Sequence, residues 1–231
     1  MALTSLIWTL IASLDESGHL VSLRPNFNDS SITNSGLLVS QMSEANGLLL
    51  TAEGNVLPLG TLDAQYLLRI PQDRAYQYVS GNTEFGAAID ATGNLHYWWG
   101  DLRLDQLAAS PLDTYREETG NFQKVDADDQ CLLALRADGS LFYFDREANP
   151  IGIDLDGPYI DCDIESYTED GGGIHGAVLN VHGEIVTFGF GSRAQEGLYN
   201  EPIGTGFTSL AITQRGRFAL HDSGVVWKWG Y

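Results

Sequence analysis

Residues 171–191 read GGGIHGAVLNVHGEIVTFGFG, and this stretch contains the pattern that decides the fold. Gly183 follows a polar residue, and apolar residues stand four positions before it (Leu179) and two and five positions after it (Ile185 and Phe188). Because glycine adopts positive φ angles readily, the pattern predicts a tight β-hairpin with Gly183 in its turn. The apolar residues of both arms are then expected to pack on one face of the hairpin.

The same pattern recurs along the whole chain. Six glycines carry it, and successive ones are 36, 39, 46, 44 and 41 residues apart: Gly18, Gly54, Gly93, Gly139, Gly183 and Gly224. At all six, the residues four before, two after and five after the glycine are apolar. Self-similarity at a period of about 40 residues is typical of repeat architectures.

Each repeat is predicted to be a small meander of β-strands. A short apolar segment precedes several of the hairpins, at 76–79, 122–125 and 208–212. One such sheet cannot bury its apolar residues alone, whereas sheets arranged radially can. We therefore predict an all-β fold, a β-propeller of about six short three- to four-stranded blades, as a single domain over residues 1–231. A seventh, degenerate blade between Arg24 and Asn46 and an ordinary β-sandwich or solenoid are the alternatives.

The charge of the chain restricts the class of partner. The 231 residues include 12 basic and 31 acidic side chains, which gives a net charge of −19, and 43% of the residues are hydrophobic. This apolar content excludes a wholly disordered acidic protein. The negative charge argues against direct binding to nucleic acid or to anionic lipid, since both require a cationic surface.

The sequence favours a cytoplasmic protein. No apolar run reaches the roughly 20 residues that a membrane span requires. The apolar opening from Leu3 to Leu14 lacks the basic start and small-residue cleavage site of a signal peptide. Two cysteines, Cys131 and Cys162, do not form a disulfide framework, and we interpret them as reduced, partly buried thiols. A single disulfide is the alternative for an exported protein.

The stretch 171–191 resembles the repeat of the regulator of chromosome condensation family, A-G-x-x-H-[ST]-x-x-L-x-x-D-G-x-[VL]-[WY]-x-[WF]-G. Its matches are His175, Leu179, Gly183, Ile185, Phe188 and Gly189. The units that end in WWG (98–100) and WKWG (227–230) are also similar to this repeat, and the unit at Gly139 has its Asp-Gly pair. The first two units lack the aromatic residues, and His is absent at the family position in the other units.

The resemblance implies a propeller of stacked four-stranded blades, usually seven, that serves as a protein-binding platform. The family includes an exchange factor for a small GTPase, and a secreted β-lactamase inhibitor has a similar propeller with short repeats. We find no set of residues to carry over for the exchange activity. A shared fold does not by itself deliver a function.

The acidic residues gather in one part of the chain. Between Glu147 and Ser192 there are nine acids and no Lys or Arg, and a second acidic cluster lies just upstream. Carboxylates on the loop-rich end of a propeller would steer a basic protein partner toward it. The predicted partner-binding residues are Asp126, Asp128, Asp129, Asp154, Asp156, Asp161, Asp163, Glu165, Glu169, Asp170 and Trp99. The alternatives are a solvated face that maintains solubility and a weak calcium site in the run from Asp154 to Asp163.

Sequence motifs for catalysis are missing. The chain has no G-x-S-x-G, H-E-x-x-H or C-x-x-C motif, and we expect no cofactor and no metal site. His175 is predicted to be a structural hydrogen-bonding residue. Trp98 is predicted to point into the core, with Trp99 on the opposite face, either packed between blades or exposed to a sugar or a protein.

These observations favour a non-enzymatic, monomeric binding protein. We expect an acidic inhibitor or immunity-type protein that caps a basic protein partner such as a toxin. The alternatives are a carbohydrate-binding propeller, with Trp99 in its site, and a propeller hydrolase with paired carboxylates in a central pocket.

Overall fold

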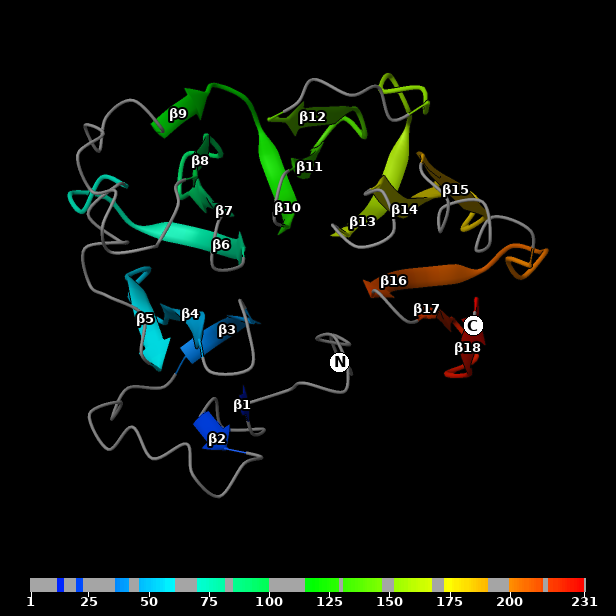
Figure 1. Cartoon of the computed structure of the whole chain (residues 1–231), viewed down its shortest axis with the longest axis horizontal. Coiled ribbons are helices and arrows are strands. Elements are labelled where there is room, and N and C mark those ends of the chain that lie inside the picture. The colour runs from blue at the N-terminus through cyan, green and yellow to red at the C-terminus, as the bar shows by residue number, and fades with distance from the viewer. Residues whose placement is uncertain are drawn as a thin grey trace. The chain divides into compact units, whose positions relative to one another are not determined.

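The computed structural model of the 231-residue chain describes the larger part of it. The described residues are 12–14, 20–22, 36–41, 46–60, 70–81, 85–99, 115–128, 131–146, 152–167, 173–190, 200–213 and 216–230. All regular secondary structure in the described residues is β-strand, which confirms the predicted all-β class (Figure 1).

The chain divides into two compact units, and the first of them, the N-terminal unit, runs from Trp8 to Phe122. It contains a two-stranded sheet of β1 (Ala12–Leu14) and β2 (Leu20–Ser22). A three-stranded sheet follows, with β3 (Gly36–Gln41), β4 (Asn46–Thr51) and β5 (Val56–Gly60). The last sheet has four strands, β6 (Tyr76–Gly81), β7 (Phe85–Asp90), β8 (Leu95–Trp99) and β9 (Tyr115–Glu118).

The second compact unit comprises Met1–Ile7 and Gln123–Tyr231, and we call it the C-terminal unit. Its described residues form three sheets of three strands each. The first sheet is β10 (Phe122–Asp128), β11 (Cys131–Arg136) and β12 (Leu141–Asp145). The second is β13 (Tyr159–Tyr167), β14 (Gly173–Asn180) and β15 (Ile185–Phe190), and the third is β16 (Phe207–Thr213), β17 (Gly216–His221) and β18 (Val226–Trp229). All are antiparallel meanders in sequence order, as predicted. That the whole chain is one domain stays a prediction.

The hairpin glycines have the predicted conformation. Five of the six lie among the described residues, and their φ angles are positive, from +70° to +87°: Gly54, Gly93, Gly139, Gly183 and Gly224. Their surroundings add a second requirement for glycine. A Cβ atom on Gly183 would lie 2.6 Å from the carbonyl oxygen of Phe207, because β16 starts directly beside this turn.

Four of the described hairpin glycines also hold the start of a later strand. The carbonyl oxygen of Gly139 accepts a hydrogen bond from the amide of Tyr159, the first residue of β13, at 2.8 Å. The same bond joins Gly183 to Phe207 at 3.1 Å. In the N-terminal unit it joins Gly54 to Tyr76 at 2.8 Å and Gly93 to Phe122 at 2.9 Å. An aromatic residue therefore opens each of these four strands.

The apolar residues of a hairpin pack on both faces of its sheet, so the expectation of one apolar face is wrong. In the second sheet of the C-terminal unit, Leu179 and Ile185 pack with Phe207 and Leu210 of the following sheet. Phe188 of the same sheet packs with Leu133 and other residues of the preceding one. Positions two and five after the glycine differ by three residues, and strand side chains alternate between faces, so the two positions must point in opposite directions.

The cysteines lie in the apolar layer between the first two sheets of the C-terminal unit. Cys131 and Cys162 are both free thiols and fully buried. Burial raises the pKa of both thiols, so they act as small apolar core residues. Within the described residues, no helix has the length and apolar character of a membrane span.

Candidate functional site

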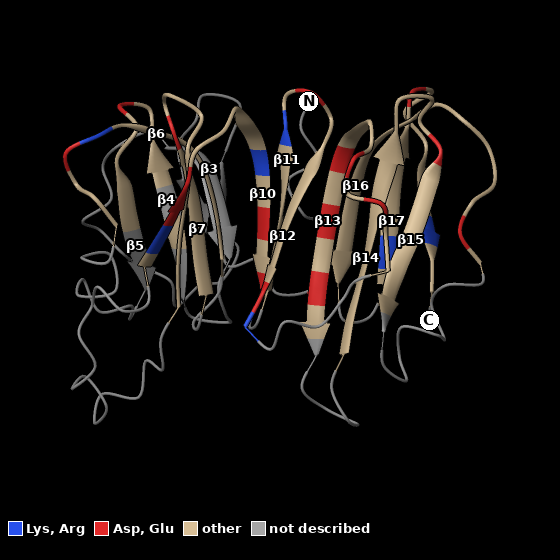
Figure 2. Cartoon of the chain, turned by 90° about the horizontal axis from the view of Figure 1, so that it is seen from above, with Lys and Arg blue, Asp and Glu red and all other residues tan. Residues whose placement is uncertain are grey.

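Five of the predicted partner-binding acids lie on two edge strands of the C-terminal unit. Asp126 and Asp128 belong to β10, and Asp161, Asp163 and Glu165 belong to β13. Each of these strands is the terminal strand of its sheet, and both carry red segments in Figure 2. A terminal strand presents unpaired amide groups along its outer edge, so the contacts of these carboxylates decide whether they are available to a partner.

Carboxylates of β10 accept hydrogen bonds from the edge of β13. The amide of Ile164 donates to Asp126 at 2.9 Å. The amide and the hydroxyl of Ser166 both donate to Asp128, the hydroxyl at 2.7 Å. Alternate residues of a strand direct their amides to opposite edges, so these are the amides that face away from β14. The two carboxylates therefore take the place that a further strand would occupy.

Asp161 continues this pattern across the next sheet. One of its carboxylate oxygens accepts a hydrogen bond from the amide of Leu210 on β16, at 2.7 Å. The other accepts bonds from the amide of Cys162, at 3.0 Å, and from the ammonium group of Lys124 on β10. The side chain of Asp161 is 9% exposed. This single carboxylate links the first strands of all three sheets in the unit.

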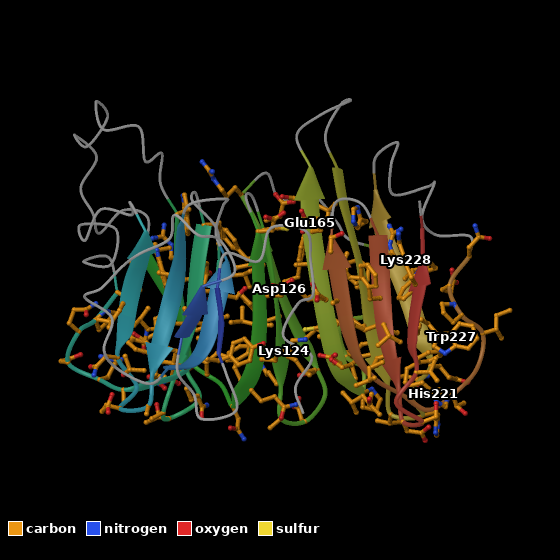
Figure 3. All side chains as sticks on the ribbon, turned by 90° about the horizontal axis from the view of Figure 1, so that it is seen from below. Lys124, Asp126, Glu165, His221, Trp227 and Lys228 are labelled. Atoms are coloured by element: carbon orange, nitrogen blue, oxygen red, sulfur yellow. The ribbon has the colours of Figure 1, made fainter. Side chains whose placement is uncertain are left out.

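Asp163 forms a carboxyl pair with Asp126. Burial and the neighbouring Asp126 together raise the pKa of Asp163 well above its usual value. Two neighbouring carboxyl groups cannot both ionise readily, so the protonated form of Asp163 is favoured. Lys124 and Asp126 are labelled near each other in Figure 3, with Glu165 nearby. A carboxyl group with a raised pKa is one feature that a hydrolase would need. Asp126, however, also accepts the hydrogen bond from Ile164 that joins β10 to β13, so the pair has a structural use.

The predicted acids therefore fall into different groups. Asp126, Asp128 and Asp161 accept hydrogen bonds that join the sheets, while Asp154 and Asp156 are exposed in the loop before β13. Glu165 is half-buried. Three further predicted residues, Asp129, Glu169 and Asp170, lie outside the described residues. A role of any of these acids in binding a partner stays a prediction.

A set of turns gathers acids, all but Glu201 exposed, at one end of the C-terminal unit. We call it the turn surface, and it consists of the turns 137–140, 181–184 and 222–225 with the loops 152–158 and 200–206. The backbone places these segments together. The amide of Leu141, directly after the turn 137–140, donates to Leu155 at 2.8 Å, and Tyr159, directly after the loop 152–158, pairs with Asn180, directly before the turn 181–184. Six acids and no Lys or Arg occur in these ranges: Asp138, Asp154, Asp156, Glu184, Glu201 and Asp222.

Apolar side chains lie among these acids. Val181 is 51% exposed, Ile203 is fully exposed and Val225 is 52% exposed. Their segments are adjacent, because the amide of Gly206 donates to His182 and the amide of Asp222 donates to Gly206, at 3.3 Å and 2.9 Å. Exposed apolar residues within a polar surround are typical of surfaces that bind other proteins. This group was not predicted from the sequence, because the density of acids along a chain does not indicate which apolar turn residues are exposed.

Trp99 packs in an aromatic layer of the N-terminal unit. Its ring lies 6.1 Å from that of Tyr97 and 6.0 Å from that of Phe85, both nearly parallel to it. The guanidinium of Arg116 on β9 lies over the Trp99 ring, 5.3 Å from its centre. Trp99 does point away from Trp98, as alternation predicts. These contacts favour packing over an open platform for a sugar.

A buried histidine that the sequence analysis left unassigned anchors the fourth strand. His96 is fully buried, with Nε2 at 3.0 Å from the Asp90 carboxylate and Nδ1 at 2.7 Å from the Tyr115 hydroxyl on β9. Burial opposes ionisation of Asp90, but hydrogen bonds from Thr92 and His96 lower its pKa below the usual range. Burial, together with Glu117, raises the pKa of Tyr115 to about 12. The group is a structural clamp between β8 and β9.

A polar residue stands three positions before each hairpin glycine, and this pattern marks Asp90 as a turn residue. The further bond of Asp90 to His96 is what the pattern does not indicate. Asp90 also accepts hydrogen bonds from the amides of Thr92 and Asn94, both at 2.9 Å. Asn180 does the same for His182 and Glu184 in its own turn, at 2.9 and 3.0 Å. Side chains that accept amides two and four residues ahead stabilise tight turns.

The run from Asp154 to Asp163 does not converge on one point. Asp154 and Asp156 lie in an exposed loop, where the amide of Asp156 donates to Asp154 at 3.0 Å, and Asp161 and Asp163 lie on β13. Within the described part of the chain, no group of three or more His, Cys, Asp or Glu side chains could hold a metal ion. The Nε2–H group of His175 donates a hydrogen bond to the carbonyl oxygen of Thr213, at 3.1 Å, which confirms the predicted structural hydrogen-bonding role.

Solved structures show which fold these sheets belong to. The chain is similar to Prp20p from Saccharomyces cerevisiae, whose structure was reported with its binding properties to Gsp1p and histones (TM-score 0.61, 13% identity, 95% of this chain and 63% of that chain). It is also similar to the ectodomain of the receptor kinase CR4 from Physcomitrella patens (0.60, 14%, 92% and 60%) and to human WBSCR16 (0.58, 14%, 91% and 65%). It spans less than two thirds of each.

These likenesses confirm an RCC1-like β-propeller repeat fold. The number of blades stays a prediction. No protein-family model and no curated protein matches the sequence. At this level of identity the likeness shows the fold alone, so the function has to be argued from the residues of this chain.

Proposed function

We propose that this protein is a non-enzymatic binding protein that holds a basic protein on its turn surface. The observation that carries the proposal is the turn surface itself, with six acids, no Lys or Arg, and three exposed apolar residues among them. Charged residues at such a surface accelerate encounter with an oppositely charged partner, and apolar residues at its centre supply affinity.

The acids that join the sheets are poor candidates for contact with a partner, which reduces the set of proposed contact residues. Asp126, Asp128 and Asp161 already accept hydrogen bonds from amides, and removing these bonds would leave buried donors unpaired. The proposed contact residues are therefore Asp154 and Asp156, together with Asp138, Glu184 and Asp222, which lie on the same surface. The yeast structures of this fold were solved with or tested against protein partners, namely Kap60, Gsp1p and histones.

A finer hypothesis is that the protein is an inhibitor or immunity-type protein of a basic toxin. Its support is the combination of a short chain, a net charge of −19 and the lack of catalytic sequence motifs. A small acidic protein of this kind would act by covering the active surface of its partner. The hypothesis requires that the isolated partner has an activity which stoichiometric amounts of this protein abolish.

Affinity capture at low salt, followed by binding measurements on each captured protein, tests the proposal. The expected partner is strongly basic, and its Kd rises at least tenfold between 50 and 500 mM NaCl. Changing Asp138, Asp154 and Asp156 to Asn should weaken it at least tenfold, mainly through a slower association rate. As a matched control, Arg146→Gln removes an exposed charge outside the turn surface and should not weaken binding. Recovery of neutral or acidic partners alone would falsify the proposal.

A further inference from the structure

The last strand of the C-terminal unit exposes a repeat position that other sheets bury. Val226 stands two residues after its hairpin glycine and is 50% exposed. Its counterparts in four other sheets are 0–9% exposed: Val56, Leu95, Leu141 and Ile185. Ile185, for example, packs with Phe207 and Leu210 of the sheet that follows it. The third sheet of the C-terminal unit keeps this apolar residue but leaves it half uncovered.

The neighbours of Val226 on β18 are exposed as well. Trp227 is 48% exposed, Lys228 is exposed, and Val225 just before them is 52% exposed. Figure 3 shows Trp227 and Lys228 on the last strand, with His221 at the turn that leads into it. The Trp227 ring packs edge-on against Phe207, with 6.4 Å between the ring centres, and still remains half exposed. Since Val226 and Trp227 point to opposite faces, the strand is partly exposed on both faces and not only on one.

The outer edge of β18 has amide groups in position to pair. In the sheet order β16-β17-β18 this strand is terminal. The amide of His221 donates to Val225 at 2.9 Å and closes the turn, so Ala219 and Trp227 form the next hydrogen-bonded pair. The amides and carbonyls of Val226 and Lys228 are therefore directed away from β17.

The N-terminal unit shows that a third strand of this fold accepts a fourth. There β8 pairs with β9, and Leu95 faces Glu118 while Tyr97 faces Arg116. Leu95 and Tyr97 stand two and four residues after their glycine, as Val226 and Lys228 do. Leu95 and Tyr97 are 0–3% exposed there, and Leu141 on β12 and Ile185 on β15 are 3–9% exposed without a fourth strand. The example of β9 therefore shows that the edge of a third strand can pair, whereas the exposure of Val226 is particular to β18.

We propose that the edge of β18 is a strand-addition site for an extended segment of another protein. The added segment pairs with the backbone of Val226 and Lys228, and its side chains cover Val226 on one face and Trp227 on the other. The net charge of −19 and the exposed Asp222 at the adjoining turn select a segment with basic residues at its ends. The proposal goes beyond the turn surface and does not depend on it.

A second copy of this chain is a poorer occupant than a basic segment. Two chains that each carry a charge of −19 repel one another. Lys228 also stands on the strand itself, and lysine on an edge strand disfavours pairing between identical edges. The edge of β18 is thus better suited to a strand from another protein than to the same strand of a second copy.

A peptide probe tests the proposal on the full chain. The probe is the blocked peptide Arg-Thr-Val-Thr-Val-Thr-Arg, and its control is the same peptide with every second amide methylated, so that it cannot pair along one edge. We expect the probe to slow hydrogen exchange of the Val226 and Lys228 amides at least tenfold and to change the fluorescence of Trp227. The methylated peptide should do neither.

Two substitutions at one position separate backbone pairing from apolar contact. Val226→Pro removes an outward amide and leaves the β17–β18 bonds intact, since the bonded pair uses Trp227. It should weaken probe binding at least tenfold, whereas Val226→Thr, which keeps the amide, should change binding less than threefold. The proposal is overturned if the methylated peptide binds equally well, or if neither peptide binds at millimolar concentration. Self-association of the wild-type chain that Val226→Pro abolishes would also overturn it, by assigning the edge to a second copy.

Discussion

The outer edges of β13 and β18 both carry backbone amides that no neighbouring strand pairs, but their surroundings differ. Both strands are terminal in their sheets and direct amides away from their neighbours. Along β13 those amides donate to carboxylates of Asp126, Asp128 and Asp161, whereas β18 carries exposed Val226 and Trp227 beside its edge. The comparison shows that acids in this protein have a structural use, since their carboxylates accept hydrogen bonds from the outer amides of an edge strand. Exposed apolar residues distinguish the edge of β18, where no such acceptor is described.

The largest effect is expected when the closed edge of β13 is opened. Asp161→Ala removes the acceptor of the Leu210 amide and the carboxylate that faces Lys124, in a mostly buried place. We expect the free energy of unfolding in urea to fall by about 3 kcal/mol, as for other broken buried charge pairs. Asp154→Ala, at an exposed acid of the same unit, is the control and should have no measurable effect. Equal effects of the two variants would mean that edge closure contributes nothing.

A second test compares one repeat position in the covered and the uncovered sheet. Ile185→Ala removes a side chain that packs against the next sheet and should cost about 3 kcal/mol. Val226→Ala at the equivalent position of β18 should cost less than about 1 kcal/mol, because the side chain is half exposed already. Thermal and urea unfolding of both variants measure the difference. Similar losses would show that β18 is covered in solution.

The hairpin glycines provide a third comparison at constant backbone conformation. Gly183 and Gly224 have φ angles of +70° and +83°, but an added Cβ meets Phe207 at Gly183 and nothing within 4 Å at Gly224. Gly224→Ala should therefore cost about 1 kcal/mol for the positive φ alone, and Gly183→Ala about 2 kcal/mol or more with the clash added. If the two losses agree, the contact between turn and next strand is soft.

The smallest expected effect concerns the carboxyl pair beside the closed edge. Because the folded pKa of Asp163 lies above its unfolded value, this group destabilises the native state progressively as pH rises above the unfolded pKa. Asp163→Asn removes that cost and should raise the free energy of unfolding by about 1 kcal/mol at pH 7. The gain should disappear near pH 3, where the carboxyl is protonated in both states. Exposed Asp156→Asn serves as the control, and a gain that is independent of pH would contradict the assignment.

The local part of the fold could be predicted from the sequence, because its causes lie within one repeat. The recurring glycine and its apolar neighbours fixed the hairpins, and the positive φ angles at positions such as Gly139 follow directly. His175 was also predictable, since the repeat pattern singled it out. The prediction that all these apolar residues share one face was wrong, because positions two and five after the glycine lie on the same strand and differ by an odd number of residues.

The use of the acids could not be predicted, because each bond joins residues of different repeats. Asp126 and Ile164 are 38 residues apart, whereas Asp161 and Leu210 are 49 apart, so no constant spacing identifies the pairs. Clustered acids in a sequence look the same whether they face solvent or close an edge. The fourth strand β9, with the sequence YREE, has no apolar alternation to announce it and depends on the clamp at His96.

The hydrogen bond from each hairpin glycine to the next sheet has a consequence for how the chain tolerates change in length. At the four described junctions a repeat supplies the docking point for its successor, so these bonds couple nearest neighbours, as in a linear chain of linked units. A whole repeat could then be duplicated or removed at these junctions with its interfaces preserved. Half a repeat could not be duplicated or removed in this way, because the change would separate a hairpin turn from the aromatic residue whose amide it binds.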